Sequence, residues 1–268
     1  MKKAEHELMK RLVSVFSVIL LMFGYSAWAA EPSRLTIAAA ADLKFAMEEI
    51  ARAFRKEHPE ATLDLVTGSS GRFYEQIVQA APFDLFFSAD VKFPQQLKEQ
   101  RLTASEVRLY ARGRIVLWSA RMNAADMKLS DLAKPDITKI AIANPKHAPY
   151  GMRAEEALKK AGLWPKVEKK LVFGENVAQT AQFAETGAAE VGIIALSLAE
   201  SPMLKPKGGY SLIPENLHSP LDQGYVILRR AEDNSSAKAF ADFVSGEAGR
   251  TIFRRYGFVL PGASGSSP

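Results

Sequence analysis

Short runs of apolar and β-branched residues alternate with amphipathic helical segments along most of this chain, and this alternation constrains the fold most strongly. Expected strands are 35–37, 61–66, 83–87, 114–118, 139–142, 171–173, 191–194 and 225–228. After an expected helix start at Asp42, apolar side chains recur at helical spacing, as at Leu43, Met47 and Ile50. The pattern predicts an α/β protein whose sheets are mixed but mostly parallel.

Two extended runs, 110–119 and 220–229, separate two sets of strands and helices, and no linker rich in Pro, Gly or Ser divides the chain. We therefore expect two lobes joined by two crossings, with a ligand cleft between them. Lobe one would comprise 30–114 plus 227–262, and lobe two 115–226. Hinge bending would close such a cleft. The Gly- and Ser-rich tail 263–268 is expected to be disordered.

The first 29 residues have the pattern of an export signal. Four basic residues precede a mostly apolar run over 12–23, and Ala27-Trp28-Ala29 is a small-x-small cleavage pattern. The apolar run is too short for a stable membrane anchor. We therefore expect residues 1–29 to be a signal peptide cleaved near Ala29, and the mature protein to lie outside the cytoplasm.

Composition removes several kinds of chemistry. The 268 residues include no cysteine, which excludes disulfides, thiolate metal sites and cysteine nucleophiles. The whole chain has 35 Lys and Arg against 30 Asp and Glu, and without residues 1–29 it has 31 against 28, a net charge of +3. The basic residues form no stripe, so nucleic acid is not an expected partner. The four histidines show no metal-binding spacing, so no bound metal cofactor is expected either.

Four expected strand-to-helix junctions carry mostly small or neutral polar residues: Ala41-Asp42, Ser69-Ser70, Tyr150-Gly151 and Asn176-Val177. Each would present unpaired backbone N–H groups and the positive end of a helix dipole at the carboxyl edge of a sheet. Open α/β sheets bind ligands at that edge. If two junctions belong to each lobe, their donors converge on the cleft. The sequence therefore predicts a site for an anion.

Each junction also has a purely structural explanation. Asp42 is a typical helix N-cap, Ser69 and Ser70 are ordinary turn and cap residues, and Tyr150 follows a proline against which its loop could pack. Val177 carries no chemical signal of its own. Only the coincidence of all four junctions favours a binding site.

A catalytic alternative uses Ser70 as the nucleophile of an exported hydrolase or transferase, with His147 and Asp90 completing the triple. Any chain of this length offers such a triple, and the sequence has neither a Gly-x-Ser-x-Gly elbow nor a Gly-x-x-x-x-Gly-Lys loop. We therefore predict a binding protein with no catalytic residue.

At these junctions the sequence resembles the periplasmic molybdate-binding proteins of ABC transporters, over essentially the whole mature chain. The resemblance rests on 38–43 (AAAADL), 68–71 (GSSG), 82–90 (PFDLFFSAD), 144–151 (NPKHAPYG) and 255–258 (RYGF). It implies a two-lobed type II periplasmic-binding-protein fold that captures molybdate or tungstate and delivers it to a membrane permease. Such a receptor is expected to be a monomer without a cofactor.

Carried over position by position, the resemblance places the oxyanion contacts at four loops. They fall on Asp42 with Ala41 before it, on Ser70 with Ser69 as a close competitor, on Tyr150, and on the backbone N–H of Val177. Molybdenum would be held only as the oxyanion, through these residues. Relatives with Ala at the third position have Tyr where this chain has Ala195, so the resemblance implies that Tyr150 supplies the missing hydroxyl.

Asp42 departs from the family pattern, in which many relatives have Ser or Asn. A carboxylate facing a dianion is repulsive, so we expect the side chain to turn back and cap its own helix, leaving backbone N–H groups for the ligand. Alternatively, it accepts a proton from a protonated oxyanion such as hydrogen phosphate. A receptor for sulfate or phosphate therefore remains open beside the molybdate receptor.

Overall fold

The computed structural model describes residues 34–262, so the predicted signal peptide and the predicted disordered tail lie outside the described residues. Ten strands in this range form two five-stranded sheets. The first sheet contains β1 (Arg34–Ala40), β2 (Thr62–Gly68), β3 (Leu85–Ser88), β4 (Arg108–Gly113) and β10 (Leu221–Ile227). The second contains β5 (Ile115–Ser119), β6 (Ile140–Ala143), β7 (Leu171–Gly174), β8 (Val191–Ala195) and β9 (Gly209–Leu212).

Both sheets follow the same plan, with the orders β2-β1-β3-β10-β4 and β7-β6-β8-β5-β9. In each, three neighbouring strands are parallel and the fourth, β10 or β5, pairs antiparallel with both of its neighbours. The reversed strand is the one that arrives from the other sheet, since β5 follows β4 directly and β10 follows β9. The predicted class, α/β with mixed and mostly parallel sheets, is confirmed.

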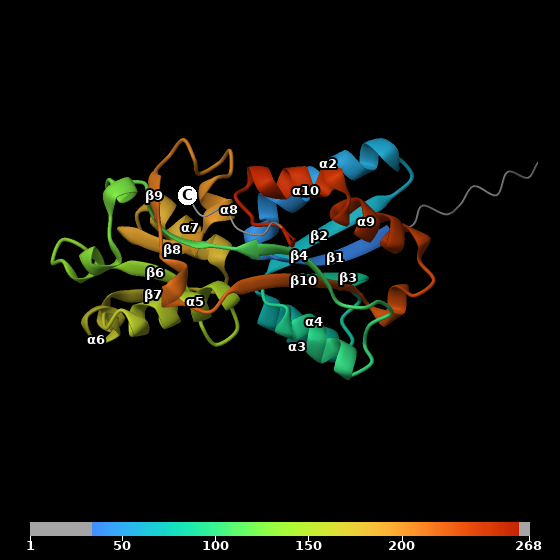
Figure 1. Cartoon of the computed structure of the whole chain (residues 1–268), viewed down its shortest axis with the longest axis horizontal. Helices are drawn as coiled ribbons and strands as arrows, with labels where there is room; N and C mark the ends of the chain where they lie inside the picture. Colours follow the sequence, from blue (N-terminus) through green and yellow to red (C-terminus); the bar gives the residue numbers. More distant parts are fainter. Residues whose placement is uncertain (1–33, 263–268) are drawn as a thin grey trace, which may run out of the picture. The chain divides into compact units, whose positions relative to one another are not determined.

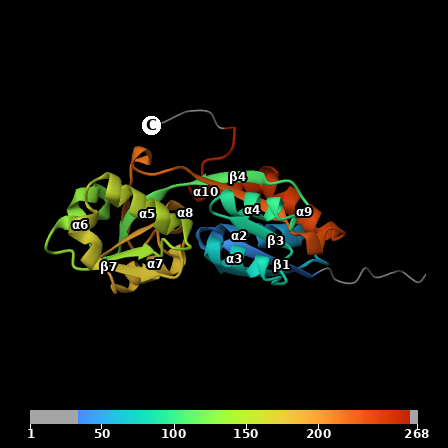
Figure 2. The ribbon, with the colours of Figure 1, turned by 90° about the horizontal axis from the view of Figure 1, so that it is seen from below.

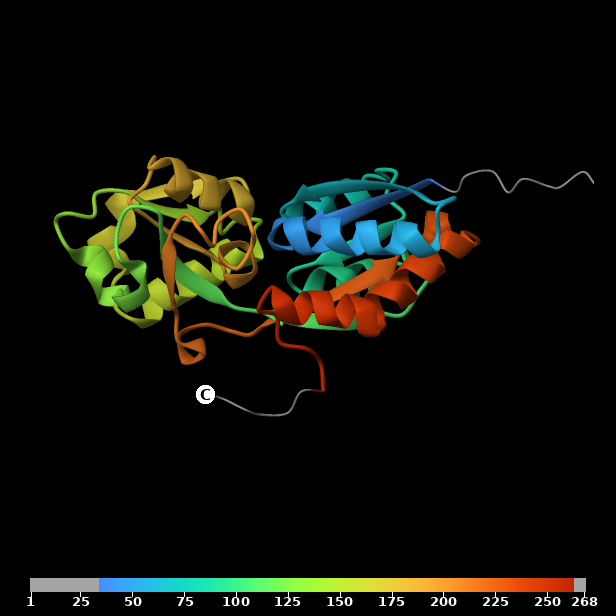
Figure 3. The same cartoon turned by 90° about the horizontal axis from the view of Figure 1, so that it is seen from above.

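Helices cover both faces of the first sheet. In Figure 1, α2 (Lys44–Glu57), α9 (Ser235–Ser245) and α10 (Glu247–Arg255) lie above it, and α3 (Ser70–Val78) and α4 (Lys92–Glu99) lie below. Figure 3 shows α2 alongside α9 and α10, and Figure 2 shows α3 and α4 from the opposite side. The apolar stripe predicted for α2 is buried, because Met47, Ile50 and Phe54 pack with the phenylalanines of α9 and α10.

The second sheet is flanked by α5 (Pro149–Lys160), α6 (Trp164–Val167), α7 (Val177–Thr186) and α8 (Leu196–Ala199). Buried side chains of β5, β6 and β8, with Trp118 among them, form a core with α5 and α7. Short 3-10 turns complete the connections: η1 (Ala41–Leu43), η2 (Ala124–Asp126), η3 (Leu129–Ala133), η4 (Glu168–Lys170), η5 (Glu215–Leu217) and η6 (Arg229–Ala231). Among residues 34–262, no helix has the length and apolar character needed to cross a membrane.

The division of the chain into lobes stays a prediction, but strand pairing corrects one of its boundaries. β10 pairs with β3 and β4 from Leu221 onward, so the chain returns to the first sheet before the predicted boundary at 227. The expected strand began too late, at 225, because Asp222, Gln223 and Gly224 interrupt the apolar run. In the structure Gln223 is fully buried, which indicates a specific polar role for it.

Candidate functional site

All four predicted junctions line one small buried cavity. Its volume is about 10 Å³, no more than a single water requires. The first sheet contributes the carboxyl ends of β1 and β2 and the start of α3, and the second contributes the starts of α5 and α7. Every residue predicted for the oxyanion lies in the lining: Ala41, Asp42, Ser69, Ser70, Tyr150 and Val177.

At the start of α3, Ser69 is occupied by other partners. It is the N-cap, and its Oγ accepts the N–H of Arg72 at 3.4 Å and hydrogen-bonds His147 Nδ1 at 2.8 Å. The N–H of Gly71 donates to the carbonyl oxygen of His147 at 3.0 Å. A Cβ at position 71 would lie 2.5 Å from that oxygen, so glycine permits this close approach. These contacts join the first sheet's helix to a loop of the second.

Unlike Ser69, Ser70 keeps two hydrogen-bond donors that no other described residue uses. Its Oγ accepts the N–H of Ala89 at 3.0 Å, which leaves the hydroxyl hydrogen to donate elsewhere. Its backbone N–H is the first-turn donor of α3 that the N-cap and His147 do not take. Both donors belong to a residue that is fully buried in the cavity wall.

The helices from the second sheet present donors in the same way. Asn176 caps α7, and its Oδ1 accepts the second and third N–H groups of the helix at 3.0 and 3.1 Å. The first N–H, that of Val177, is not taken by the cap. α5 begins with Pro149, which has no N–H, so Tyr150 carries the first donor of that helix.

The side chain of Asp42 is held by residues distant in sequence. Its Oδ2 accepts the Tyr150 hydroxyl at 3.0 Å and Gln223 Nε2 at 2.8 Å. Gln223 Nε2 also lies 3.2 Å from the Tyr150 hydroxyl, and the Tyr110 hydroxyl donates to Gln223 Oε1 at 2.7 Å. We call Asp42, Tyr150, Gln223 and Tyr110 the central network. Within the described residues, Asp42 Oδ1 has no hydrogen-bond partner.

The prediction that Asp42 caps its own helix is wrong. The 3-10 turn η1 has Ala40 at its N-cap, and no side chain caps it. Tyr150 and Gln223 supply two side-chain donors from the second sheet's helix α5 and from β10, and the carboxyl turns toward them. A local sequence rule could not anticipate this, because both donors lie more than 100 residues away.

Burial dominates the electrostatics of the central network. It raises the pKa of Asp42 from 3.8 to about 6, against the opposing effect of Gln223, Tyr150 and the adjacent backbone N–H groups of Asp42 and Leu43. Burial and the neighbouring Asp42 raise the pKa of Tyr150 well above its ordinary value, so its hydroxyl stays protonated. Among the described residues, no Lys, Arg or His lines the cavity. Apart from the carboxyl of Asp42, a charge placed there meets only dipoles and uncharged hydrogen-bonding groups.

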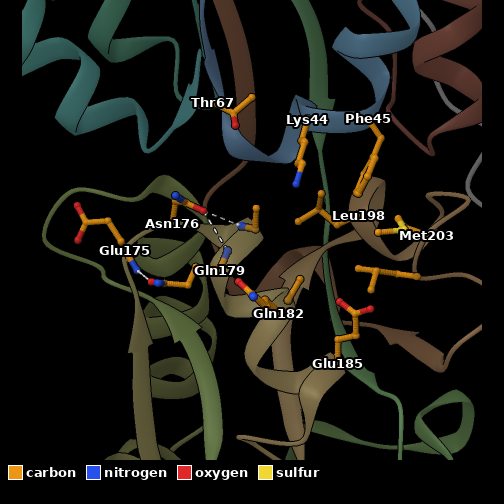
Figure 4. A pocket seen from close by; sticks show the side chains of 13 residues that line it. Lys44, Phe45, Thr67, Glu175, Asn176, Gln179, Gln182, Glu185, Leu198 and Met203 are labelled. Carbon is orange, nitrogen blue, oxygen red and sulfur yellow. Dashed lines mark hydrogen bonds between the residues drawn. The ribbon is translucent and has the colours of Figure 1, made fainter. Parts of the chain in front are cut away.

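A larger cavity of about 560 Å³ adjoins the small one, since Asn176 lines both. Figure 4 shows Lys44 and Phe45 pointing into it from the first sheet's side, with Gln182 and Glu185 on the opposite wall. Its lining sets one cation against two carboxylates and several apolar side chains. This combination does not suit an anion, so we assign the candidate site to the small cavity.

The structure does not assemble the catalytic triple considered from sequence. His147 Nδ1 pairs with Ser69 and not with Ser70, and Asp90 Oδ2 pairs with Arg153 at 3.0 Å. Burial lowers the pKa of His147 below its usual value. Among residues 34–262, no group of three or more His, Asp and Glu side chains is placed to hold a metal ion.

Two ion pairs at the edges of the cleft were not predicted. Arg153 of α5 reaches Asp90, which follows β3, at 3.0 Å, and both side chains are nearly buried. Arg72 of α3 reaches Glu175, which precedes α7, at 3.1 Å, and both are about half exposed. We call these the rim pairs. Charged residues are common on surfaces, so no sequence signal singled them out. For Gln223, the signal was a polar residue inside an extended apolar run.

Comparisons with known proteins agree with this architecture. The molybdate-binding protein ModA of Azotobacter vinelandii is 36% identical over 244 residues, which cover 91% of this chain and 96% of that protein. ModA of Rhodobacter capsulatus is 39% identical over 201 residues, covering 74% and 77%. The solved structure of the Azotobacter vinelandii periplasmic molybdate-binding protein matches with a TM-score of 0.80 at 32% identity, covering 85% of this chain and 99% of that one.

The sequence model of the bacterial extracellular solute-binding proteins matches residues 35–259, which is nearly all of the described structure. The chain therefore belongs to the bacterial extracellular solute-binding protein family.

Proposed function

We propose that this chain is a periplasmic receptor that captures molybdate, and also tungstate, in the small cavity and delivers it to an ABC-transporter permease. The carrying observation is that the donors left unused at the starts of α3, α5 and α7 meet in one cavity. The names of the relatives at 36–39% identity point to the same ligand. The protein would act as a monomer without catalysis or a resident cofactor.

The proposed contacts are the Ser70 hydroxyl and N–H, the N–H groups of Tyr150 and Val177, and the η1 residues Ala41 and Asp42. The Tyr150 hydroxyl orients the site, because it already donates to Asp42 Oδ2. Ser69 lines the same cavity but supports the site without contacting the ligand, because its hydroxyl is already hydrogen-bonded to His147 and to the N–H of Arg72. A fully ionised oxyanion accepts charge-assisted hydrogen bonds from such donors, and the helix dipoles stabilise its charge without a cation. The molybdenum would be enclosed by its own four oxygens, so none of these residues is a metal ligand.

Ligand entry requires movement of the two sheets relative to one another. A cavity of about 10 Å³ is smaller than a tetrahedral oxyanion, and the walls come from both sheets. The two connections near Arg114 and before Leu221 are the natural hinges. We infer that the lobes part to admit the oxyanion and close on it again.

Calorimetric titration of the ligand-free mature protein with molybdate, tungstate, sulfate and phosphate in parallel tests this proposal. We expect tight one-to-one binding of molybdate and tungstate only. Sulfate has the same charge but is smaller, so donors on two rigid lobes would be left under-satisfied. Absence of molybdate binding, or turnover of a chromogenic ester, would overturn the proposal.

The second candidate, a receptor for phosphate, is favoured by one observation. Asp42 is an acceptor in the cavity, and an ionised carboxylate would pair with the proton of hydrogen phosphate. In the same titration, phosphate binding that exceeds molybdate binding at pH 7 would select this function instead.

A further inference from the structure

One carboxylate oxygen of Asp42 is buried and accepts no hydrogen bond from the described residues. The residue is 1% exposed, and its Oδ2 accepts hydrogen bonds from two side chains, Tyr150 and Gln223. Its Oδ1 is buried and has no partner among the described residues, although the residue lines the cavity. An unsatisfied buried carboxylate oxygen is costly, whereas a carboxylic acid could donate from that position.

Within the described part of the chain, no cation lies close enough to Asp42 to favour its ionised form. The titratable groups that face it are the hydroxyls of Tyr150 on α5 and Tyr110 on β4, and both act as donors. Lys44, at the start of α2, points instead into the larger cavity (Figure 4). Three other elements contact η1: β2, α7 and α8. The residues of β2 and α7 that line the cavity with Asp42, Gly68 and Val177, are uncharged, and so is every residue of α8.

A bound oxyanion changes what Oδ1 faces. The ligand would bring two negative charges and only acceptor oxygens to the cavity, so an ionised Asp42 would repel it without any hydrogen bond between them. A neutral Asp42 would donate its Oδ1–H to a ligand oxygen while Oδ2 keeps its bonds to Tyr150 and Gln223. Burial already favours this neutral form, because it raises the pKa of Asp42 to about 6.

We propose that Asp42 is a neutral carboxylic acid in the oxyanion complex, where it donates a hydrogen bond to the ligand, so that one proton is bound with each oxyanion. This inference rests on the proposed function. Molybdate at neutral pH carries no proton, so the proton comes from solvent and bonds to Asp42 Oδ1. The receptor would therefore release its ligand more readily in alkaline than in mildly acidic surroundings.

The test measures protons and affinity together. Sodium molybdate is titrated calorimetrically into the ligand-free protein from pH 6.5 to 8.5, in pairs of buffers with different ionisation enthalpies. For the native protein we expect uptake of close to one proton at pH 8. Because the complex binds one proton more than the free protein, the association constant for molybdate should fall by about tenfold per pH unit near pH 8.

Two variants assign the proton to Asp42. Asp42→Asn retains a donor at the same position but cannot titrate, so we expect binding without proton uptake and an affinity that is constant with pH. Ser70→Ala removes a donor from the same cavity without removing the titrating group. It should bind more weakly while keeping the same slope and the same proton uptake as the native protein.

Three results would contradict the proposals. Molybdate binding by the native protein with no proton uptake and a flat affinity would overturn the role of Asp42, even if Asp42→Asn failed to fold. Uptake that persists in Asp42→Asn would place the proton elsewhere and would also overturn it. Failure of the native protein to bind molybdate at any of these pH values would instead reject the proposed function.

Discussion

The central network and the rim pairs both connect the two sheets, but they do so with opposite chemistry. The central network joins Asp42 to Tyr150 and Gln223 in a buried setting without a cation. The rim pairs, Arg153 with Asp90 and Arg72 with Glu175, are full ion pairs. Charge is thus compensated at the edges of the cleft and left uncompensated at its centre. Under the proposed function, the choice of ligand would depend on the central network and closure of the lobes on the rim pairs.

The two rim pairs also differ from each other. The side chains of Arg153 and Asp90 are 6% and 10% exposed, whereas those of Arg72 and Glu175 are 50% and 53% exposed. Removing one partner of a buried ion pair costs far more free energy than removing one partner of an exposed pair, because the remaining charge is left buried. Variants at the buried rim pair, at the central network and at the exposed rim pair should therefore have large, intermediate and small effects.

The largest effect is expected at the buried rim pair. Arg153→Met would leave the Asp90 carboxylate without its cation whenever the lobes close, at a cost of about 3–5 kcal/mol. Parting of the lobes would expose Asp90 to water, so the loss should appear as weaker molybdate binding, by at least about 100-fold, with a smaller change in the melting temperature of the ligand-free protein. Calorimetric titration and thermal unfolding measure the two quantities.

The double variant Arg153→Met with Asp90→Asn is the matched control, because it removes the stranded charge as well. It should recover a large part of the lost affinity. Native affinity in the single variant Arg153→Met would show that this pair takes no part in closure, and the comparison of centre with rim would break.

An intermediate effect is expected at the centre, in the stability of the ligand-free protein. Because burial raises the pKa of Asp42 from 3.8 to about 6, the folded protein binds more protons than the unfolded chain between these values. Its stability therefore falls as pH rises through this interval and stays lower above it. Asp42→Asn lacks this loss. Between pH 4 and pH 8, its free energy of unfolding should therefore rise by about 2 kcal/mol relative to that of the native protein.

Denaturant unfolding of both proteins at several pH values measures this gain. Only the change with pH is compared, so a constant offset caused by the new amide does not affect the result. Parallel stability curves for the native protein and Asp42→Asn would mean that the carboxyl is not buried in the ligand-free state.

The smallest effect is expected at the exposed rim pair. Arg72→Gln removes a cation whose pKa is raised by Glu175 and by Glu75, both in contact with solvent. Exposed pairs contribute little and are screened by salt, so molybdate affinity should change by no more than about fivefold at low salt and less at high salt. A loss comparable to that of Arg153→Met would show that exposure does not distinguish the two rim pairs.

Much of the fold could be predicted because its signals are local. The strand at 35–37 and the helix through Met47 and Phe54 appear in the structure as β1 and α2, because their apolar spacing matches the period of each element. Short elements such as α8 and β9 were missed. Four residues are too few to show a period, and these segments are stabilised by packing and by pairing with β5.

The candidate site divides in the same way. The small and polar residues that begin α3, α5 and α7 were visible in the sequence, and the structure places all of them around one cavity. Gln223, Tyr110 and Arg153 were not assigned to it, because the partners of each are distant in sequence and only the folded arrangement of the two sheets brings them together.

By itself, the sequence determined the alternation of strands and helices, the positions of the helix starts and the residue types that begin them, since each depends on neighbours within a few residues. Only the tertiary structure decided what those residues do. In the structure Ser69 hydrogen-bonds His147, whereas Ser70 lines the cavity with donors to spare. Asp42 does not cap its own helix but accepts hydrogen bonds from Tyr150 and Gln223. The physical reason is that hydrogen bonding and desolvation act over a few ångströms in space, whatever the separation along the chain.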